Sequence, residues 1–100
     1  MNKVFVVYIL TNHPRHTVLY VGMSGRMQTR LTEHKEKKVV RSFTARYNVS
    51  KLVYYELFGD PYLAACRERE IKKWRRSKKI KLINDFNPEW KDLSDEVKEC

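Results

Sequence analysis

The sequence predicts a small α/β domain of the α+β type, in which a mostly antiparallel three-stranded sheet is flanked by helices. Three runs rich in β-branched and aromatic residues, at residues 4–11, 18–23 and 51–58, predict the strands. Two segments with apolar residues at helical spacing predict the flanking helices. A chain of 100 residues with 42% hydrophobic content suits one domain with a small core.

The first two strands are expected to pair as an antiparallel hairpin, because the stretch between them, residues 12–16, is rich in turn formers. If the turn centres on Pro14, Tyr8 and Tyr20 lie at equal distances from it and face each other on one side of the sheet. Such a pair has two interpretations. The tyrosines either pack as structural residues whose hydroxyls find partners, or they belong to a functional site.

A first helix is expected after Ser24, a residue type that favours the N-cap position. Met27, Arg30, Leu31 and His34 follow at i, i+3, i+4 and i+7, which places them on one helical face. Polar groups on an apolar face tend to occur at functional sites. Each also has a structural alternative, since an arginine can extend past the core and a histidine can be a hydrogen-bonded core residue. Their shared face, directed at the tyrosine-bearing sheet, favours the functional interpretation.

A second helix is expected to begin after the third strand, where Asp60 can cap it and Pro61 can occupy its first turn. Ile71 lies on its apolar face, and Glu68 lies at the margin of that face, about 60° from Ile71 at about 100° per residue. Glu68 either forms an ion pair with Lys72, one turn later, or binds a divalent metal. Mg²⁺ commonly takes only one or two protein carboxylates and completes its coordination with water and phosphate.

The net charge of +9 is concentrated in one part of the chain. Residues 67–81 contain nine Lys or Arg against two Glu, a local balance of +7, whereas residues 82–100 contain two Lys against six acids, a balance of −4. A charge run usually marks a solvated helix face, but one this lopsided favours binding to nucleic-acid phosphates. The predicted nucleic-acid-binding residues are Lys72, Lys73, Arg75, Arg76, Lys78 and Lys79, with Lys35 and Lys38 after the first helix.

Membrane insertion and disulfide bonding are not expected. No apolar run approaches the length of a membrane span, and the first residues lead directly into a strand, so we expect a cytoplasmic protein without a membrane partner. Cys66 and Cys100 have neither zinc-site spacing nor the pattern of a disulfide framework, which predicts reduced thiols.

Taken together, these motifs resemble the GIY-YIG nuclease family, and especially its small single-domain members. Residues 6–8, Val-Val-Tyr, stand where the family has Gly-Ile-Tyr, and residues 20–22, Tyr-Val-Gly, stand where it has Tyr-Ile-Gly. Arg30 and His34 fall at helical positions that the family uses. Residues 67–76 and 87–93 resemble the ending of the small subgroup, so the resemblance covers roughly residues 3–93.

The chain departs from the family pattern at two positions. Val6 replaces the first glycine, a substitution compatible with a strand, and Met23 stands where some members carry a lysine directly after the second motif. Met23 therefore removes one phosphate-binding cation. The resemblance implies a nuclease domain at residues 1–93, followed by an acidic C-terminal tail at residues 94–100.

The resemblance implies a metal-dependent endonuclease that hydrolyses phosphodiester bonds in nucleic acid, with DNA as the expected substrate, Mg²⁺ or Mn²⁺ as the cofactor, and a role in DNA repair or recombination. The alternative is a non-catalytic nucleic-acid-binding module that keeps the nuclease fold and the basic helix. Joint presence of two tyrosines, an arginine, a histidine and a glutamate favours the enzyme, because binding alone would require only the lysines and arginines.

The same resemblance implies roles for the site residues. Tyr20 is the general base, Tyr8 orders the attacking water or the base, and Arg30 holds the scissile phosphate by charge-assisted hydrogen bonds. Glu68 is the metal ligand, and His34 bonds a phosphate oxygen or assists proton transfer. Tyr47 and Asn87 are possible accessory residues.

Overall fold

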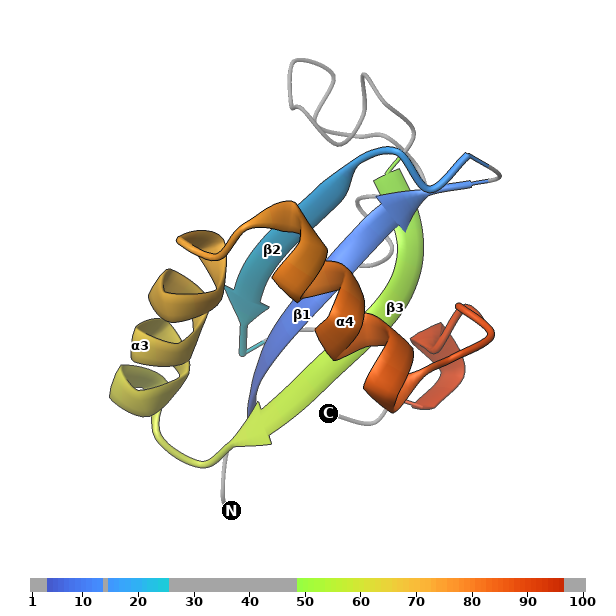
Figure 1. Cartoon of the computed structure of the whole chain (residues 1–100). Helices are drawn as coiled ribbons and strands as arrows, with labels where there is room; N and C mark the ends of the chain where they lie inside the picture. Colours follow the sequence, from blue (N-terminus) through green and yellow to red (C-terminus); the bar gives the residue numbers. More distant parts are fainter. Residues whose placement is uncertain (1–3, 14, 26–48, 97–100) are drawn as a thin grey trace.

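The computed structural model describes residues 4–13, 15–25 and 49–96. In this part of the chain the strands β1 (Phe5–Asn12), β2 (Leu19–Ser24) and β3 (Val49–Phe58) form one antiparallel sheet with the order β2-β1-β3. Helices α3 (Pro61–Lys72) and α4 (Arg76–Phe86) lie over one face of the sheet, and the short 3₁₀ helix η1 (Ser94–Glu96) follows (Figure 1). The predicted α+β class is therefore confirmed. Five predicted site residues lie outside the described residues: Arg30, His34, Lys35, Lys38 and Tyr47.

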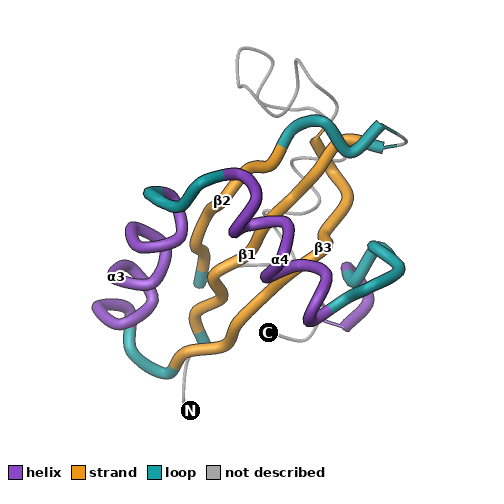
Figure 2. Tube along the Cα trace, in the orientation of Figure 1, coloured by secondary structure: helices purple, strands orange, loops and turns teal. Residues whose placement is uncertain are grey.

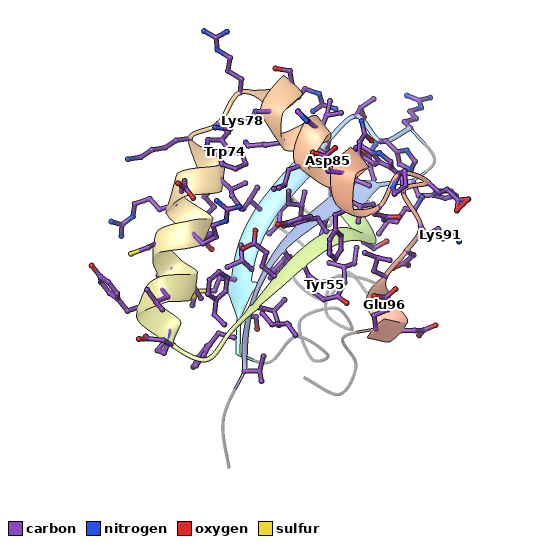
Figure 3. All side chains as sticks on the ribbon, turned by 60° about the horizontal axis from the view of Figure 1, so that its bottom comes forward. Tyr55, Trp74, Lys78, Asp85, Lys91 and Glu96 are labelled. Carbon is purple, nitrogen blue, oxygen red and sulfur yellow. The ribbon has the colours of Figure 1, made fainter. Side chains whose placement is uncertain are left out.

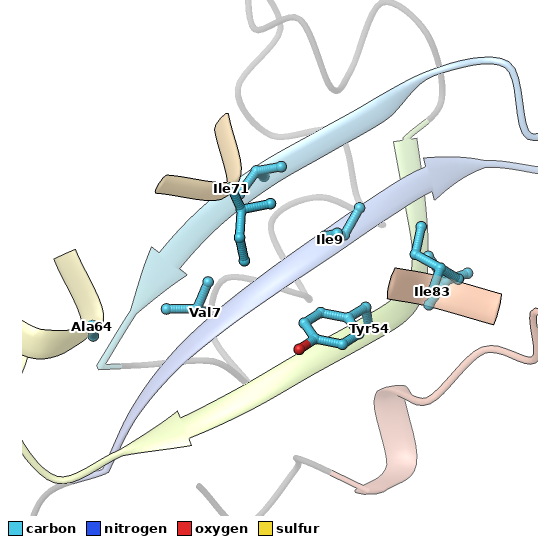
Figure 4. Packing of buried hydrophobic residues seen from close by; sticks show 8 residues of the cluster. Val7, Ile9, Tyr54, Ala64, Ile71 and Ile83 are labelled. Carbon is cyan, nitrogen blue, oxygen red and sulfur yellow. The ribbon is translucent and has the colours of Figure 1, made fainter. Parts of the chain in front are cut away.

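Both faces of the central strand are covered, which explains why β1 is a nearly continuous apolar run. Its odd-numbered residues pack with α3 and α4, and the close view in Figure 4 shows this cluster, which includes Val7, Ile9, Tyr54, Ala64, Ile71 and Ile83. Its even-numbered residues form a second cluster on the opposite face, with the buried members Val6, Tyr8, Leu10, Val49, Leu52 and Leu93. The tyrosine-bearing face is thus not the face that carries the two helices.

The strand pairing of the hairpin differs from the prediction by two residues, which moves the centre of the turn by one residue. Tyr8 lies opposite Gly22, and Tyr20 lies opposite Leu10, so the two tyrosines share a face but form a diagonal pair. This register centres the turn on Arg15 instead of Pro14.

The Asn12 side chain gives the reason for this register. Its Oδ1 accepts a hydrogen bond from the Val18 backbone N–H at 2.7 Å, and its Nδ2 donates to Thr17 Oγ1 at 2.9 Å. The Asn12 carbonyl also accepts from the His16 N–H at 2.8 Å. These bonds close a loop that is longer than a tight turn at the proline, as asparagine side chains often do.

The start of the second helix agrees with the sequence, but its extension is interrupted. Asp60 Oδ1 accepts a hydrogen bond from the Tyr62 N–H at 2.7 Å, and Pro61 occupies the first turn, as predicted. The basic run does not form one continuous helix, because α3 ends at Lys72 and α4 begins at Arg76. A short loop separates the two helices (Figure 2). The half-buried Trp74 lies in this break and packs against the helix-side cluster, which allows both helices to contact the sheet.

Candidate active site and nucleic-acid interface

The tyrosines of the two sequence motifs lie close together on the sheet face opposite α3 and α4. Their ring centroids are 6.5 Å apart, and the ring planes meet at 33°. Tyr8 is only 2% exposed, whereas Tyr20 is partly exposed. Of the two phenols, Tyr20 is therefore the more accessible.

Gly22 makes room for the ring of Tyr8. A Cβ atom at Gly22 would lie 2.6 Å from both Cζ and Oη of Tyr8 and 3.0 Å from Cε1, which is closer than side-chain contacts allow. The glycine of the second motif is thus required by the phenol of the first motif. Sequence reasoning gave Gly22 no role of its own, because the contact depends on the Tyr8–Gly22 register.

Glu68 lies on the flank of α3 that is directed away from β3. Arg67 marks the other flank, because its Nε donates to both carboxylate oxygens of Glu56 on β3, at 3.0 and 3.2 Å. When residues are counted at about 100° each around the helix, the buried residues Ala64 and Ile71 lie between Arg67 and Glu68. Because the strand order is β2-β1-β3, the Glu68 flank is directed to the β2 side, toward the strand that carries Tyr20.

The ion pair expected as the structural alternative for Glu68 is present, with Lys72 Nζ 3.6 Å from Glu68 Oε1. The Glu68 side chain is 25% exposed, so it remains accessible to a ligand. Among the residues that the structure describes, no three His, Cys, Asp or Glu side chains gather into a metal-binding group. A single carboxylate suits Mg²⁺ or Mn²⁺ when water and substrate phosphate complete the coordination, and Glu68 meets that requirement. Metal binding by Glu68 stays a prediction.

A polar network fastens α3 to the sheet. Glu56 accepts hydrogen bonds from the Tyr54 hydroxyl and from Arg67, whose guanidinium also bonds Glu70 and lies 5.1 Å from the Trp74 ring centroid. Burial raises the pKa of Tyr54, and the hydrogen bond to Glu56 raises this pKa further. Burial alone would lower the pKa of Arg67, but hydrogen bonds to Glu70 and Glu56 outweigh burial and raise it. This network holds the helix that carries Glu68 at a fixed rotation.

The predicted nucleic-acid-binding cations gather at the corner where α3 meets α4. We call this set the basic corner: Lys72, Lys73, Arg75, Arg76, Lys78 and Lys79. Within the described part of the chain, Lys72 is the member that forms an ion pair with an acid. Lys78 Nζ lies 4.2 Å from the Trp74 ring centroid, and Figure 3 shows both side chains at the junction of the helices. The basic corner belongs to the helical face of the sheet, not to the tyrosine face.

A hollow of about 370 Å³ runs along α3 beside the basic corner. Its lining residues are Cys66, Arg69, Glu70, Lys73 and Trp74. The hollow therefore combines cations with an aromatic ring, a composition that suits nucleic-acid contacts. It lies on the helical side of the molecule, away from the tyrosine pair.

Asn87 has a structural role at the end of α4. Its Nδ2 donates to the carbonyls of Val53 at 3.1 Å and Lys91 at 2.9 Å, and its Oδ1 accepts from the Lys91 N–H at 3.1 Å. Asn87 is only 6% exposed, so both amide hydrogens are committed to the backbone. An accessory role in the active site stays a prediction.

The first residues of the expected acidic tail are folded. Ser94–Glu96 form η1, and Glu96 Oε1 accepts a hydrogen bond from the Tyr55 hydroxyl at 2.8 Å, so this part is attached to β3 (Figure 3).

None of the helices in the described ranges has the length and apolar character needed to cross a membrane.

Comparisons with known proteins agree with the sheet and its motifs. A UPF0213 protein of Syntrophus aciditrophicus (strain SB) is 35% identical over 83 residues, which span 83% of this chain and 92% of that protein. UPF0213 proteins of Staphylococcus saprophyticus and Staphylococcus haemolyticus are 36% and 34% identical over 67 residues, which span 67% of this chain and 80% of each relative. No solved structure matches the chain significantly. The family model of the GIY-YIG catalytic domain matches residues 4–81, and the chain therefore belongs to the GIY-YIG family.

Proposed function

We propose that this protein is a metal-dependent endonuclease that hydrolyses phosphodiester bonds in DNA. The observation that carries the proposal is the Tyr8–Tyr20 pair, in which one phenol is buried and the other is accessible on the same sheet face. Membership of the GIY-YIG family places the chain among nuclease-type domains that act on nucleic acid and generally use divalent metals. Gly22 supports the proposal by leaving room for the Tyr8 ring, which fixes the position of that phenol beside Tyr20.

Phosphodiester hydrolysis requires a deprotonated water, neutralised phosphoryl oxygens and a protonated leaving oxygen. In this proposal Tyr20 acts as a phenolate, which the positive charges of Arg30 and the metal would favour, and it accepts the proton of the attacking water. Tyr8 orients Tyr20 or that water. Arg30 binds the scissile phosphate, and His34 bonds a phosphate oxygen or transfers a proton to the leaving group.

Glu68 would hold the divalent ion, Mg²⁺ or Mn²⁺, which supplies positive charge to the phosphoryl oxygens when bound. The orientation of the Glu68 flank toward β2 supports this assignment, because Tyr20 is a residue of β2. Lys72 is the present counter-ion of Glu68 and is itself exposed, so it can turn to the nucleic-acid backbone.

The proposed path of the nucleic acid passes from the basic corner to the tyrosine face. These surfaces lie on opposite faces of the sheet, and β2 is the edge strand that separates them on the side of α3. A bound strand that contacts both surfaces would therefore run around the β2 edge, past the Glu68 flank. Electrostatic contacts at the basic corner would supply affinity without sequence preference.

One assay tests the proposed reaction. Purified protein is incubated with plasmid, single-stranded, branched and RNA substrates in Mg²⁺, Mn²⁺ or EDTA. We expect cleavage of at least one DNA form with either metal and none in EDTA. Cleavage of RNA alone would contradict the substrate, and full activity in EDTA would contradict the metal.

The second candidate function is a nucleic-acid-binding module without catalysis. The Glu68–Lys72 ion pair favours it, because the pair gives the Glu68 carboxylate a structural role that needs no metal. The same assay separates the two functions when the binding of each substrate is measured in parallel. Tight binding with no cleavage under any metal condition would identify the module.

A further inference from the structure

A second group of titratable side chains lies at the tip of the β1–β2 hairpin. The His16 ring stacks on Trp90 with centroids 5.2 Å apart and planes at 26°, and Nε2 of His16 lies 3.1 Å from Lys51 Nζ. The His16 carbonyl accepts a hydrogen bond from Arg76 Nη2 at 3.1 Å. Three segments far apart in the sequence, the hairpin, β3 and the α4 region, therefore meet at one histidine.

The backbone at both stacked residues is left-handed. His16 and Trp90 each have a φ of 53°, and they are the non-glycine residues with positive φ in the part of the chain that is described. This conformation is unfavourable for residues with a Cβ and is found where surrounding structure enforces it. The stack is thus held in place by the fold, and its position is defined before any ligand binds.

The group is cationic and has no acidic partner among the described residues. Neither Lys51 nor Arg76 forms an ion pair there. The charged and titratable groups that face His16 are Lys51 from β3, His13 from the turn at a ring distance of 6.0 Å, and Arg76 from α4. Burial lowers the pKa of His16, and the charges of Lys51 and His13 lower it further. An anion bound at this point would offset the positive charges of Lys51 and Arg76 and would favour the protonated form of His16.

We propose that His16, Lys51 and Arg76 form a subsite that binds a phosphate of the nucleic-acid backbone. The proposal rests on the proposed function in taking nucleic acid as the ligand. Phosphate oxygens accept hydrogen bonds from the Lys51 ammonium and the Arg76 guanidinium, and protonated His16 adds a third donor. The Trp90 ring stacks on the imidazole and would add a cation–π contact once His16 is protonated.

The subsite lies between the two surfaces that the nucleic acid must contact. His16 precedes Tyr20 by four residues, which span at most about 14 Å at about 3.4 Å per residue. Phosphates of one strand are spaced by about 3.4 Å along a duplex, so the subsite holds a phosphate within about four nucleotides of the one at Tyr20. Arg76 also belongs to the basic corner, so the subsite connects that corner with the end of the sheet.

Binding of fluorescent duplex DNA in EDTA, at several salt concentrations, tests the subsite without cleavage. Lys51→Gln and Arg76→Gln should each lower the slope of log affinity against log salt by about 0.9, the value for one phosphate contact. The matched control is Lys91→Gln, because the Lys91 ammonium already lies 3.1 Å from the Glu89 carboxylate. The control removes the same charge and should leave the slope nearly unchanged.

The histidine is tested by pH. We expect wild-type affinity for the duplex to rise as the pH falls from 7.5 to 6, because phosphate binding favours protonated His16. His16→Asn should reduce that rise to the part contributed by His13 and His34, and asparagine tolerates the left-handed backbone at this position. In NMR titrations the pKa of the His16 ring should move upward when the duplex is added.

The subsite would be overturned if Lys51→Gln and Arg76→Gln gave the same slope of log affinity against log salt as Lys91→Gln. A His16 ring pKa that duplex DNA leaves unchanged would also overturn it. If inorganic phosphate moved this pKa and duplex DNA did not, nucleic acid would be rejected as the ligand. Failure of the subsite is distinguishable from failure of the proposed function, because the binding assay contains no metal. A protein that passes these binding tests but never cleaves would refute the endonuclease and keep the subsite.

Discussion

The phenol ring of Tyr8 lies over Gly22, its direct neighbour across β1 and β2. A Cβ at Gly22 would come within 2.6 Å of the Tyr8 hydroxyl oxygen. The two family motifs are therefore one packing unit, in which the glycine of one strand sets the position of the phenol on the other. Because the rings of Tyr8 and Tyr20 are 6.5 Å apart, a displaced Tyr8 would disturb Tyr20 as well.

Gly22→Ala is expected to slow single-turnover cleavage by up to about 100-fold, because a displacement near 1 Å can have that effect on a positioned group. Overpacking should also lower the free energy of unfolding by about 1–3 kcal/mol. Gly59→Ala is the control, because no atom lies within 4 Å of a Cβ there, and we expect unchanged cleavage. Wild-type cleavage rate and stability in Gly22→Ala would contradict the packing.

Glu68→Gln is expected to abolish metal-dependent cleavage and to retain DNA binding, because the amide is a poor ligand for a divalent cation. Glu89→Gln is a matched control, since it removes the same charge from an exposed carboxylate that pairs with Lys91 outside the two helices. Cleavage and binding are measured on the same preparations. Full cleavage by Glu68→Gln would reject the metal assignment.

The basic corner is tested by the double variant Lys73→Gln/Arg75→Gln, which spares the Lys72 partner of Glu68. We expect weaker binding to all DNA sequences and a log–log salt slope reduced by about 0.9 per lost contact. Lys81→Gln/Lys91→Gln removes two charges that already pair with Asp85 and Glu89 and should have a smaller effect. Equal salt slopes in the two double variants would place the binding surface elsewhere.

The Tyr54–Glu56 contact predicts a loss of stability at alkaline pH. The folded protein holds the Tyr54 proton more tightly than the unfolded chain, in which a phenol has a pKa of about 10. This contribution is complete below pH 10 and declines as the pH rises above 10, because the unfolded chain then releases a proton that the folded protein keeps. Urea unfolding at pH 8 and pH 10.5 should show a smaller decline for Tyr54→Phe. An equal decline in both proteins would contradict the assignment.

The elements that local chemistry determines could be predicted from the sequence. Asp60 and Pro61 mark the start of α3, and the apolar runs give the three strands. The centre of the turn lies one residue later than predicted, because Asn12 closes the loop through side-chain bonds that depend on the folded geometry. The break between α3 and α4 carries no Gly or Pro and follows from the packing of Trp74.

The candidate site was predictable in part. The spacing of the motifs placed Tyr8 and Tyr20 on one face, but long-range register was needed to find the Gly22 contact. Concentration of positive charge in residues 67–81 was visible in the sequence. The position of those charges on the face opposite the tyrosines was not, because it depends on which side of the sheet the helices cover.

The most direct test of the proposed mechanism is the single-turnover cleavage rate of Tyr20→Phe, with thermal unfolding measured on the same samples. The substitution keeps the ring and its packing but deletes the ionisable oxygen, so we expect an unchanged fold and a rate lower by about 10²- to 10⁴-fold. Tyr8→Phe should have a smaller effect if Tyr8 only orients. A Tyr20→Phe protein that cleaves at the wild-type rate, and differs only by about 1 kcal/mol in stability for a lost hydrogen bond, would contradict the mechanism.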